Sequence, residues 1–271
     1  MEPEKILQEI AGQVAACKSC QLSFARKKAV PGEGPAGAEI MLIGEGPGFY
    51  ENEQGRPFVG AAGKFLDELL EKAGVSRGEV FITNVVKCRP PGNRDPLPEE
   101  LSACGGYLER QIEAINPLVI VTLGRYSMAR FLPNVRISEV HGQPAWVRGR
   151  LIIPMFHPAA ALHQPSLKTS VERDFSRLPE WIQQARQNGH GALVRADAAR
   201  TADGLSGQPP RLAKEAQAPF AKVPQQASLL DPAKPDVEDL AAPDGAAGSA
   251  ENGDDKNGEP GKDQPTQLSL F

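Results

Sequence analysis

Residues 40–58 read I-M-L-I-G-E-G-P-G-F-Y-E-N-E-Q-G-R-P-F and contain the sharpest change in the chain from apolar residues to turn-forming residues. The four apolar residues 40–43 stop abruptly at a turn rich in Gly and Pro, which is typical of a buried strand. Glycines in such a turn let the backbone bend tightly and approach a ligand closely. Two carboxylates, Glu45 and Glu51, follow the strand, and Phe58 comes a few residues later. Because ligands of open α/β sheets bind beyond the carboxyl ends of the strands, this stretch is the first candidate for a site.

Strand-like and helix-like segments alternate through the first part of the chain. Beside 40–43, apolar runs rich in β-formers occupy 80–86, 118–123 and 151–156. Helical spacing of apolar residues occupies 4–17, 61–73, 98–115 and 170–187. This alternation predicts a three-layer α/β/α fold with a central four-stranded parallel sheet. The polar segments after the strands should then meet at one edge of the sheet.

The composition divides the 271 residues into two parts. Residues 191–265 are rich in Ala, Pro, Gly, Asp and Lys, and such a segment cannot bury enough apolar surface to fold. We therefore expect a folded domain over 1–188, a disordered linker over 189–263 and a terminal peptide over 264–271. The formal charge of −4 does not by itself indicate a nucleic-acid partner. Without an apolar run of about 18 residues or a signal peptide, the sequence predicts a cytoplasmic protein with no membrane partner.

Four cysteines, at positions 17, 20, 88 and 104, are all that the chain contains. A C-x2-C pair with two further cysteines, in a compartment where thiols stay reduced, suggests a metal site. Four thiolates are able to hold either zinc or an iron–sulfur cluster, and the spacing matches neither zinc ribbons nor the common ferredoxin patterns. Cys17 and Cys104 also lie on apolar helix faces, so inert core thiols are a third interpretation. The residues alone leave this choice open.

Four motifs together resemble the family 4 uracil-DNA glycosylases. They are G-E-G-P-G at 44–48, G-R-P-F-V-G-A-A-G at 55–63, T-N-V-V-K-C-R-P-P at 83–91 and H-P-A-A at 157–160. The resemblance extends over about residues 1–185. It implies the uracil-glycosylase α/β/α fold and a [4Fe-4S] cluster held by Cys17, Cys20, Cys88 and Cys104. A related branch carries a reactive His after the second strand, and the corresponding stretch 87–95 has none.

Uracil excision requires a base that has left the DNA stack, and the resemblance assigns residues to its recognition. Phe58 matches the aromatic platform on which the pyrimidine stacks. Asn84 matches the amide that reads uracil, since an amide offers a donor and an acceptor together. Gly44 and Gly46 are the expected substrate-binding positions of the glycine turn.

Breaking the bond from N1 to the sugar puts negative charge on the uracil and positive charge on the sugar. His157 is the predicted donor to uracil O2, where a fixed donor lowers the barrier. Glu45 and Glu51 are both candidates to orient water or to exclude the methyl group of thymine, and the sequence does not assign their roles.

DNA also has to be held outside the pocket. Lys64, Lys87, Arg89 and Arg94 lie in or beside the motifs and are candidates for phosphate contacts. Leu162 stands in a segment that resembles the family's intercalating loop and is the expected wedge into the vacated stack.

The last five residues, Q-L-S-L-F, resemble the peptide that docks bacterial replication proteins onto the sliding β clamp. In this interpretation Leu268, Leu270 and Phe271 contribute apolar contacts, and Gln267 forms hydrogen bonds at the rim of the clamp pocket. A flexible linker would then concentrate the protein near replicating DNA of the bacterial nucleoid.

The resemblance thus implies a monofunctional N-glycosyl hydrolase that removes uracil from DNA in base excision repair, and we expect it to act as a monomer. Three alternatives are a non-catalytic iron–sulfur protein that binds lesions, a glycosylase of broader deaminated-base specificity, and an enzyme of free nucleotides.

Overall fold

The computed structural model describes residues 2–188, and the elements and contacts below all belong to this part of the chain. The predicted linker over 189–263 lies outside the described residues. So does the predicted clamp peptide, with Gln267, Leu268, Leu270 and Phe271.

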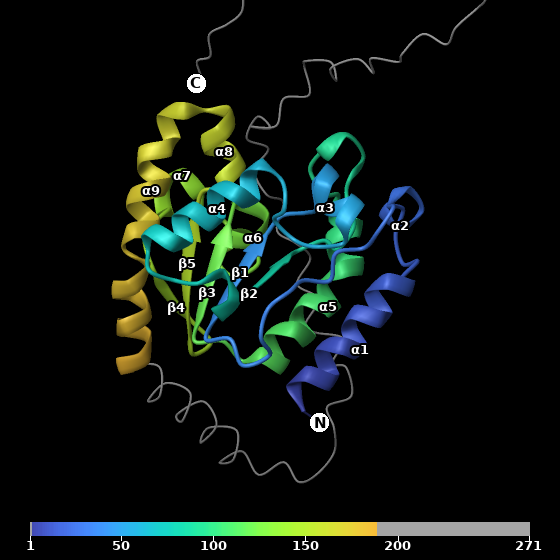
Figure 1. The fold of residues 1–271 in the computed structure, drawn as a ribbon, viewed down its shortest axis with the longest axis horizontal. Helices are drawn as coiled ribbons and strands as arrows, with labels where there is room; N and C mark the ends of the chain where they lie inside the picture. The colour runs from blue at the N-terminus through green and yellow to red at the C-terminus, as the bar shows by residue number, and fades with distance from the viewer. Residues whose placement is uncertain (1, 189–271) are drawn as a thin grey trace, which may run out of the picture. The chain divides into compact units, whose positions relative to one another are not determined.

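A five-stranded sheet with the order β2-β1-β3-β5-β4 forms the middle layer (Figure 1). The strands are β1 (Ile40–Gly44), β2 (Val80–Asn84), β3 (Val119–Leu123), β4 (Ala145–Val147) and β5 (Arg150–Met155). The four expected strands are confirmed, and they run parallel. The expected total of four is corrected by β4, which pairs antiparallel with β5 at the edge. It has three residues, none of them buried, so it lacks the apolar run by which the others were found.

The strand register brings the carboxyl ends of the parallel strands to one edge. Gly44 at the end of β1 pairs with Asn84 at the end of β2. On the other side of β1, Leu123 at the end of β3 pairs with Met155 of β5. The chain leaves β1 toward β2 on one side and reaches β3 on the other, which makes this edge a topological switch point.

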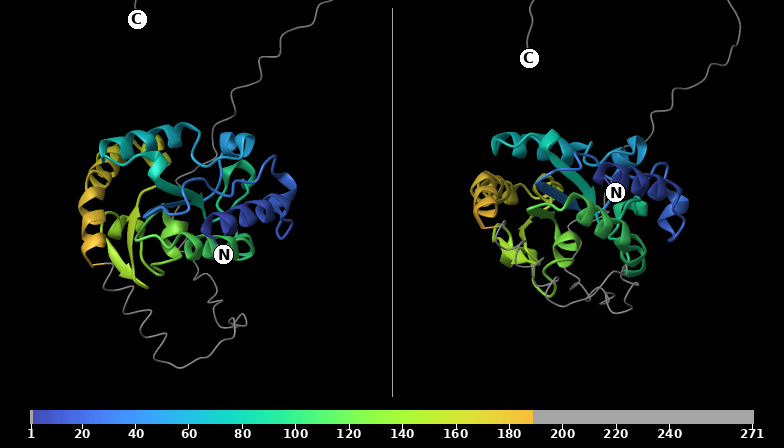
Figure 2. Two further views of the ribbon diagram at one scale, coloured as in Figure 1. Left: turned by 60° about the horizontal axis from the view of Figure 1, so that its bottom comes forward. Right: turned by 90° about the horizontal axis from the view of Figure 1, so that it is seen from below.

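Helices cover both faces of the sheet (Figures 1 and 2). One face carries α4 (Ala61–Lys72), α8 (Pro158–His163), α9 (Lys168–Ser176) and the helical residues 178–188. The other face carries α1 (Pro3–Ala16) and α5 (Pro98–Ile115). The shorter helices are α2 (Leu22–Ala25), α3 (Phe49–Gln54), η1 (Arg77–Glu79), η2 (Pro91–Asn93), α6 (Arg125–Ala129), α7 (Ile137–Val140) and η3 (Pro165–Leu167).

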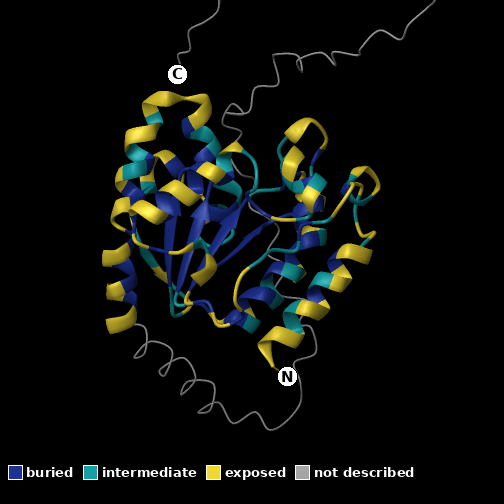
Figure 3. Cartoon of the chain, viewed as in Figure 1, coloured by how far each residue is buried: buried dark blue, intermediate teal, exposed yellow. Residues whose placement is uncertain are grey.

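Alternate side chains of β1 explain the three layers. Ile40 and Leu42 pack into one core cluster together with α4 and α9, whereas Met41 and Ile43 pack into the other together with α5. Every residue of β1, β2 and β3 is buried, as Figure 3 shows by the dark strands between exposed helix faces. The expected α/β/α architecture is therefore confirmed. Within residues 2–188, no helix combines the length and the apolar character needed to cross a bilayer.

Candidate active site

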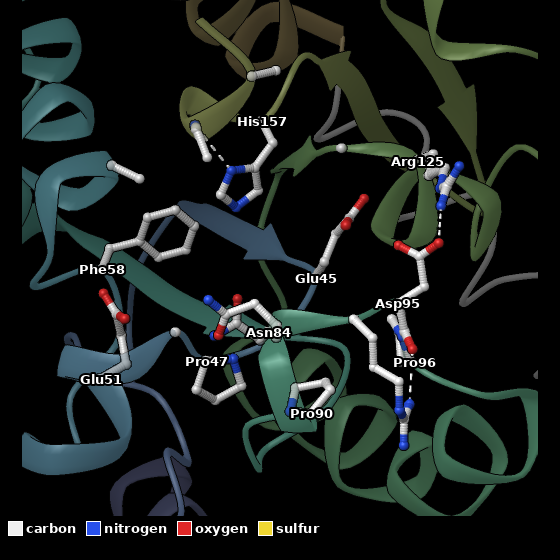
Figure 4. A pocket seen from close by; sticks show the side chains of 18 of the residues that line it. Glu45, Pro47, Glu51, Phe58, Asn84, Pro90, Asp95, Pro96, Arg125 and His157 are labelled. Atoms are coloured by element: carbon white, nitrogen blue, oxygen red, sulfur yellow. Dashed lines mark hydrogen bonds and ion pairs between the residues drawn. The ribbon is translucent and has the colours of Figure 1, made fainter. Parts of the chain in front are cut away.

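A pocket with a volume of about 550 Å³ opens at the carboxyl edge of the sheet. Figure 4 shows Phe58 and Glu45 on either side of Asn84 and His157, with Glu51 beneath Phe58. These five side chains come from three separate stretches of the sequence, 45–58, 84 and 157, and all line the pocket, as does Gly46. The structure thus brings together the side chains that the sequence singled out for recognition and chemistry.

Asn84 carries the clearest sign of a missing ligand. Its side chain is 1% exposed, and neither Oδ1 nor Nδ2 has a hydrogen-bond partner. Leaving one such buried polar atom unpaired costs about 1–3 kcal/mol. Because Asn84 lines the pocket, a ligand with one donor and one acceptor would satisfy both atoms.

Gly44 makes room for this amide. A Cβ atom at Gly44 would lie 2.4 Å from Oδ1 of Asn84 and 2.8 Å from the Phe58 ring. No side chain therefore fits at this position, and Gly44 acts by allowing Asn84 and Phe58 to approach the backbone of β1.

Phe58 has a backbone conformation that is unfavourable for a residue with a side chain. Its φ angle is 51°, in the left-handed region, which costs of order 1–3 kcal/mol. Arg77 holds it there by donating hydrogen bonds to the carbonyl oxygens of Phe58 (3.2 Å) and Pro57 (2.7 Å). The guanidinium of Arg77 is itself paired with Glu33 and Asp67. Phe58 is therefore fixed by a charged network that the sequence analysis did not identify.

Glu51 fixes the same loop from the other side. Its Oε1 accepts hydrogen bonds from the backbone N–H groups of Val59 (2.8 Å) and Gly60 (2.9 Å). These two residues immediately precede Ala61, the first residue of α4. Glu51 thus has a clear positioning function, whatever further contact it makes with a ligand.

Gly63 is the third support of Phe58, and it yields a testable prediction. A Cβ at Gly63 would lie 2.0 Å from the carbonyl oxygen of Phe58. We expect Gly63→Ala to displace Phe58 and to lower the free energy of unfolding by about 1–3 kcal/mol, the usual cost of overpacking. Chemical denaturation measures the change. Gly106→Ala is the matched control, because Gly106 is an exposed helical glycine with nothing within 4 Å of a Cβ. This control should gain up to about 1 kcal/mol in stability. Equal losses in the two variants would contradict the prediction.

Glu45 has a different environment from Glu51. Burial raises the pKa of Glu45 to about 7, although the backbone N–H of Tyr126 donates to its Oε1 at 3.2 Å. The Arg125 guanidinium opposes this increase, but it is paired with Asp95, as Figure 4 shows. A carboxylate poised to gain or lose a proton near neutrality is suited to acid–base work.

His157 is held as a neutral donor. Its Nδ1 accepts a hydrogen bond from the backbone N–H of Ala159 (3.1 Å), so the ring proton lies on Nε2. Burial lowers the pKa of His157 to about 4. The imidazole also stacks against Phe58, with ring centroids 5.4 Å apart. The ring therefore offers one N–H at neutral pH without carrying a charge.

Lys87 does not lie where we expected, and its assignment to DNA is corrected. Its side chain is 1% exposed, and Nζ donates to Thr83 Oγ1, to the Asn84 carbonyl and to Gln111 Oε1 at 2.6–2.8 Å. Burial lowers the pKa of Lys87 to about 7. The side chain is unable to reach a phosphate, and it instead anchors the segment that carries Asn84.

The other DNA candidates lie nearer to solvent. Lys64 is exposed on α4, and Leu162 on α8 is 47% exposed. Arg89 lies over the ring of Phe49, with its guanidinium carbon 5.3 Å from the ring centroid. Arg94 lines the pocket but forms a bidentate pair with the buried Glu100, which restrains its guanidinium.

The four cysteines lie around a second, small pocket. Cys17, Cys20, Cys88 and Cys104 all line it, together with Arg26. The Arg26 guanidinium donates to Cys88 Sγ (3.0 Å), and the backbone N–H of Lys87 donates to Cys104 Sγ (3.2 Å). In the described part of the chain, no group of three or more Cys, His, Asp or Glu side chains is arranged to hold a metal ion. The four thiols thus line one pocket, but they are not arranged around a single metal-ion position.

Comparison with known proteins identifies the family. A profile described as "Uracil DNA glycosylase superfamily" matches residues 31–178. A type-4 uracil-DNA glycosylase of Sulfurisphaera tokodaii is 47% identical over 184 residues, which cover 64% of this chain and 84% of the relative. A type-4 uracil-DNA glycosylase of Thermotoga maritima is 44% identical over 66% of this chain and 96% of the relative. The chain belongs to the type-4 uracil-DNA glycosylases.

The chain is also similar, more distantly, to a type-5 uracil-DNA glycosylase. A type-5 uracil-DNA glycosylase of Pyrobaculum aerophilum is 32% identical over 48% of this chain and 65% of the relative. As a type-4 uracil-DNA glycosylase, the chain is an enzyme, and the expected family is confirmed.

Proposed function

We propose that this type-4 uracil-DNA glycosylase removes uracil from DNA by hydrolysing the bond between N1 of the base and C1′ of the sugar. The observation that carries the proposal is the buried amide of Asn84, which lines the pocket with both polar atoms unpaired. Uracil presents O4 as an acceptor and N3–H as a donor side by side, which matches Nδ2 and Oδ1. Cytosine presents the opposite pattern, so the rotamer of this amide decides between the two bases.

In the proposed reaction the base leaves the duplex and enters the pocket against Phe58. As the N1–C1′ bond breaks, the electron pair moves onto the uracil ring and its O2. The Nε2–H of neutral His157 donates to this developing charge, which is stabilised without a proton having to be transferred. Water adds its oxygen to C1′, and its proton passes to a carboxylate.

Glu45 is the carboxylate that we assign to this step. Its raised pKa and its position across Asn84 from Phe58 support a contact with water on the sugar side. Glu51 already accepts two backbone hydrogen bonds, which supports a role in positioning Phe58. Sequence alone had left these two roles open.

A duplex oligonucleotide with one uracil tests the activity directly. We expect uracil release, followed by strand cleavage in alkali at the abasic site, and no cleavage of the matching thymine duplex. Parallel substrates with hypoxanthine or other deaminated bases define the specificity. A protein that binds the uracil duplex but never releases the base would refute the proposed reaction.

For the four cysteines we propose a [4Fe-4S] cluster. A cluster takes one thiolate for each iron, so it needs thiols that surround a space, whereas zinc needs all four within bonding distance of one centre. All four side chains line one small pocket, which supports the cluster. The hydrogen bonds to the sulfur atoms of Cys88 and Cys104 are of the kind that tunes such clusters. When bound, the cluster would supply a fixed link between α1 and the segment after β2, and the hydrolysis does not need it.

Cys104→Ser tests the cluster without reference to activity. We expect the variant to lose bound iron and visible absorbance together. Its free energy of unfolding should fall by more than the approximately 1 kcal/mol typical of point substitutions. Iron analysis and thermal melts of the purified protein measure both changes. Zinc in place of iron in the wild-type protein would contradict the assignment.

We also propose that residues 267–271 dock on the sliding clamp and so keep the enzyme near replicating DNA. The support is the sequence pattern at Gln267, Leu268, Leu270 and Phe271. The proposal takes the cytoplasm as the compartment, where thiols stay reduced, and a monomer as the acting unit. Titration calorimetry with purified clamp tests it, since deletion of 267–271 should abolish the binding heat. Binding that survives the deletion would disprove this attachment.

A further inference from the structure

Two large aromatic side chains stand exposed beside the mouth of the pocket. Phe49 is 52% exposed and Tyr50 is 59% exposed, and they are neighbours at the start of α3. Their rings meet edge to face, with centroids 5.4 Å apart. Each ring leaves a large apolar surface in water, and adjoining exposed apolar groups often mark an interaction site.

The pair is built into the rim of the pocket. Gly48 and Glu51, the residues on either side of the pair, both line the pocket. The ring of Tyr50 lies over the loop that carries Phe58, because a Cβ at Gly60 would lie 3.4 Å from its Cδ2. In Figure 1, α3, which carries the aromatic pair, and α8 stand on opposite sides of the carboxyl edge of the sheet.

A cation accompanies the two rings. The guanidinium of Arg89 lies over Phe49, and its Nε donates to Oδ1 of Asn93 (2.8 Å), another residue of the pocket rim. Aromatic rings next to an Arg are the combination on which proteins stack the bases of single-stranded nucleic acid. A strand that delivers one nucleotide into the pocket has to pass over this rim.

We propose that Phe49 and Tyr50 form a stacking platform for an unpaired base adjacent to the extruded uracil. The inference rests on the proposed function and deepens it, because it extends the substrate site by one nucleotide. The neighbour of the uracil stacks on the platform once it is free of its own partner strand. The platform therefore increases the affinity for single-stranded DNA more than the affinity for duplex DNA, in which the neighbouring base is still paired.

The test is a thermodynamic cycle between the rings and the base. Fluorescence anisotropy measures the Kd of single-stranded oligonucleotides that carry a 2′-fluorinated deoxyuridine, whose fluorine destabilises the sugar cation and blocks cleavage. Matched oligonucleotides have an abasic residue immediately 5′ or immediately 3′ of it. The variants are Phe49→Ala/Tyr50→Ala and Phe49→Leu/Tyr50→Leu, the second of which keeps the bulk without the aromatic faces. Trp146→Ala is the control, because Trp146 is an exposed aromatic residue on the edge strand β4.

We expect both double variants to bind the intact single strand about tenfold more weakly, as loss of base stacking predicts. Removing the base on one side of the uracil should weaken the binding of the oligonucleotide to the wild-type protein by a similar factor. The same change should leave the Kd of the two double variants unaltered. Trp146→Ala should behave as wild type. The proposal is overturned if the double variants bind the intact single strand as tightly as wild type. It is also overturned if removal of the neighbouring base changes the Kd of wild type and variants equally. Uracil release by the wild-type protein separates this outcome from failure of the proposed function, which would leave the wild type itself inactive on uracil.

Discussion

Asn84→Ala is expected to lose uracil excision by a factor of about 100–1000 while the fold keeps its stability. The loss follows from the proposed contact between this amide and the base, since one preorganised donor is typically worth this factor in rate. The free energy of unfolding should not fall, because the amide has no hydrogen bond to lose in the free protein and its two unpaired atoms no longer have to be buried. Single-turnover assays with excess enzyme and chemical denaturation measure the two effects on the same preparation.

Gln111→Ala provides the matched contrast. This amide is equally buried, but it accepts from Lys87 Nζ (2.7 Å) and donates to the carbonyl of Pro31 (2.8 Å). Its removal takes away one of the three acceptors of the buried Lys87 Nζ, so the free energy of unfolding should fall by about 1–3 kcal/mol. If Asn84→Ala destabilises the protein as much as Gln111→Ala, the unpaired amide is not reserved for a ligand.

The sequence predicted the parts of the fold in which local pattern and burial agree. The helix expected over 98–115 is α5 (Pro98–Ile115), because Pro98 marks its first turn and apolar residues recur at helical spacing. The parallel strands were visible because they are buried on both faces and read as continuous apolar runs. Shorter elements such as β4 and α8 have too few residues for any periodicity to show.

The sequence singled out side chains that the fold brings together in one pocket, but it did not show how they are supported. Lys87 was expected at the surface because a lysine is almost never fully buried without partners. Its partners Thr83 and Gln111 come from β2 and α5, so only the fold brings them together. The same holds for Arg77, which fixes Phe58 from beyond the next helix in the sequence. No local pattern marks a residue whose role is to hold another residue's backbone.

Glu45→Gln is expected to remove the pH dependence of the reaction. If ionised Glu45 takes the proton of the attacking water, the wild-type rate should rise with pH and level off above about 7, the raised pKa of this carboxyl. His157 adds no second change in rate to the pH profile near neutrality, since its lowered pKa lies near 4. Glu45→Gln should be slower by about 100-fold or more at pH 8 and show a flat profile. Single-turnover rates between pH 5.5 and about 9 test this, with the range chosen to bracket the expected ionisation.

Glu51→Gln is the control for this experiment. Its amide oxygen still accepts from the N–H groups of Val59 and Gly60, so the variant should keep the rise in rate through pH 7. A flat profile for Glu51→Gln with a normal profile for Glu45→Gln would exchange the roles assigned to the two carboxylates.

Stability should change with pH in the opposite sense to activity. Burial raises the pKa of Glu45 from 4.5 in a free side chain to about 7, so the folded state prefers the protonated carboxyl. The resulting stabilisation is fully present below pH 4.5 and is lost as the pH rises through 7. Glu45→Gln has no charge to bury and should be more stable than wild type at pH 8 by up to roughly 3 kcal/mol. Near pH 4 the two proteins should unfold alike. A Glu45→Gln variant that is slower at pH 8 yet no more stable than wild type would contradict this account. The carboxylate of Glu45 would then be better solvated than its burial implies. Its pKa would lie too low to control the rate near neutrality.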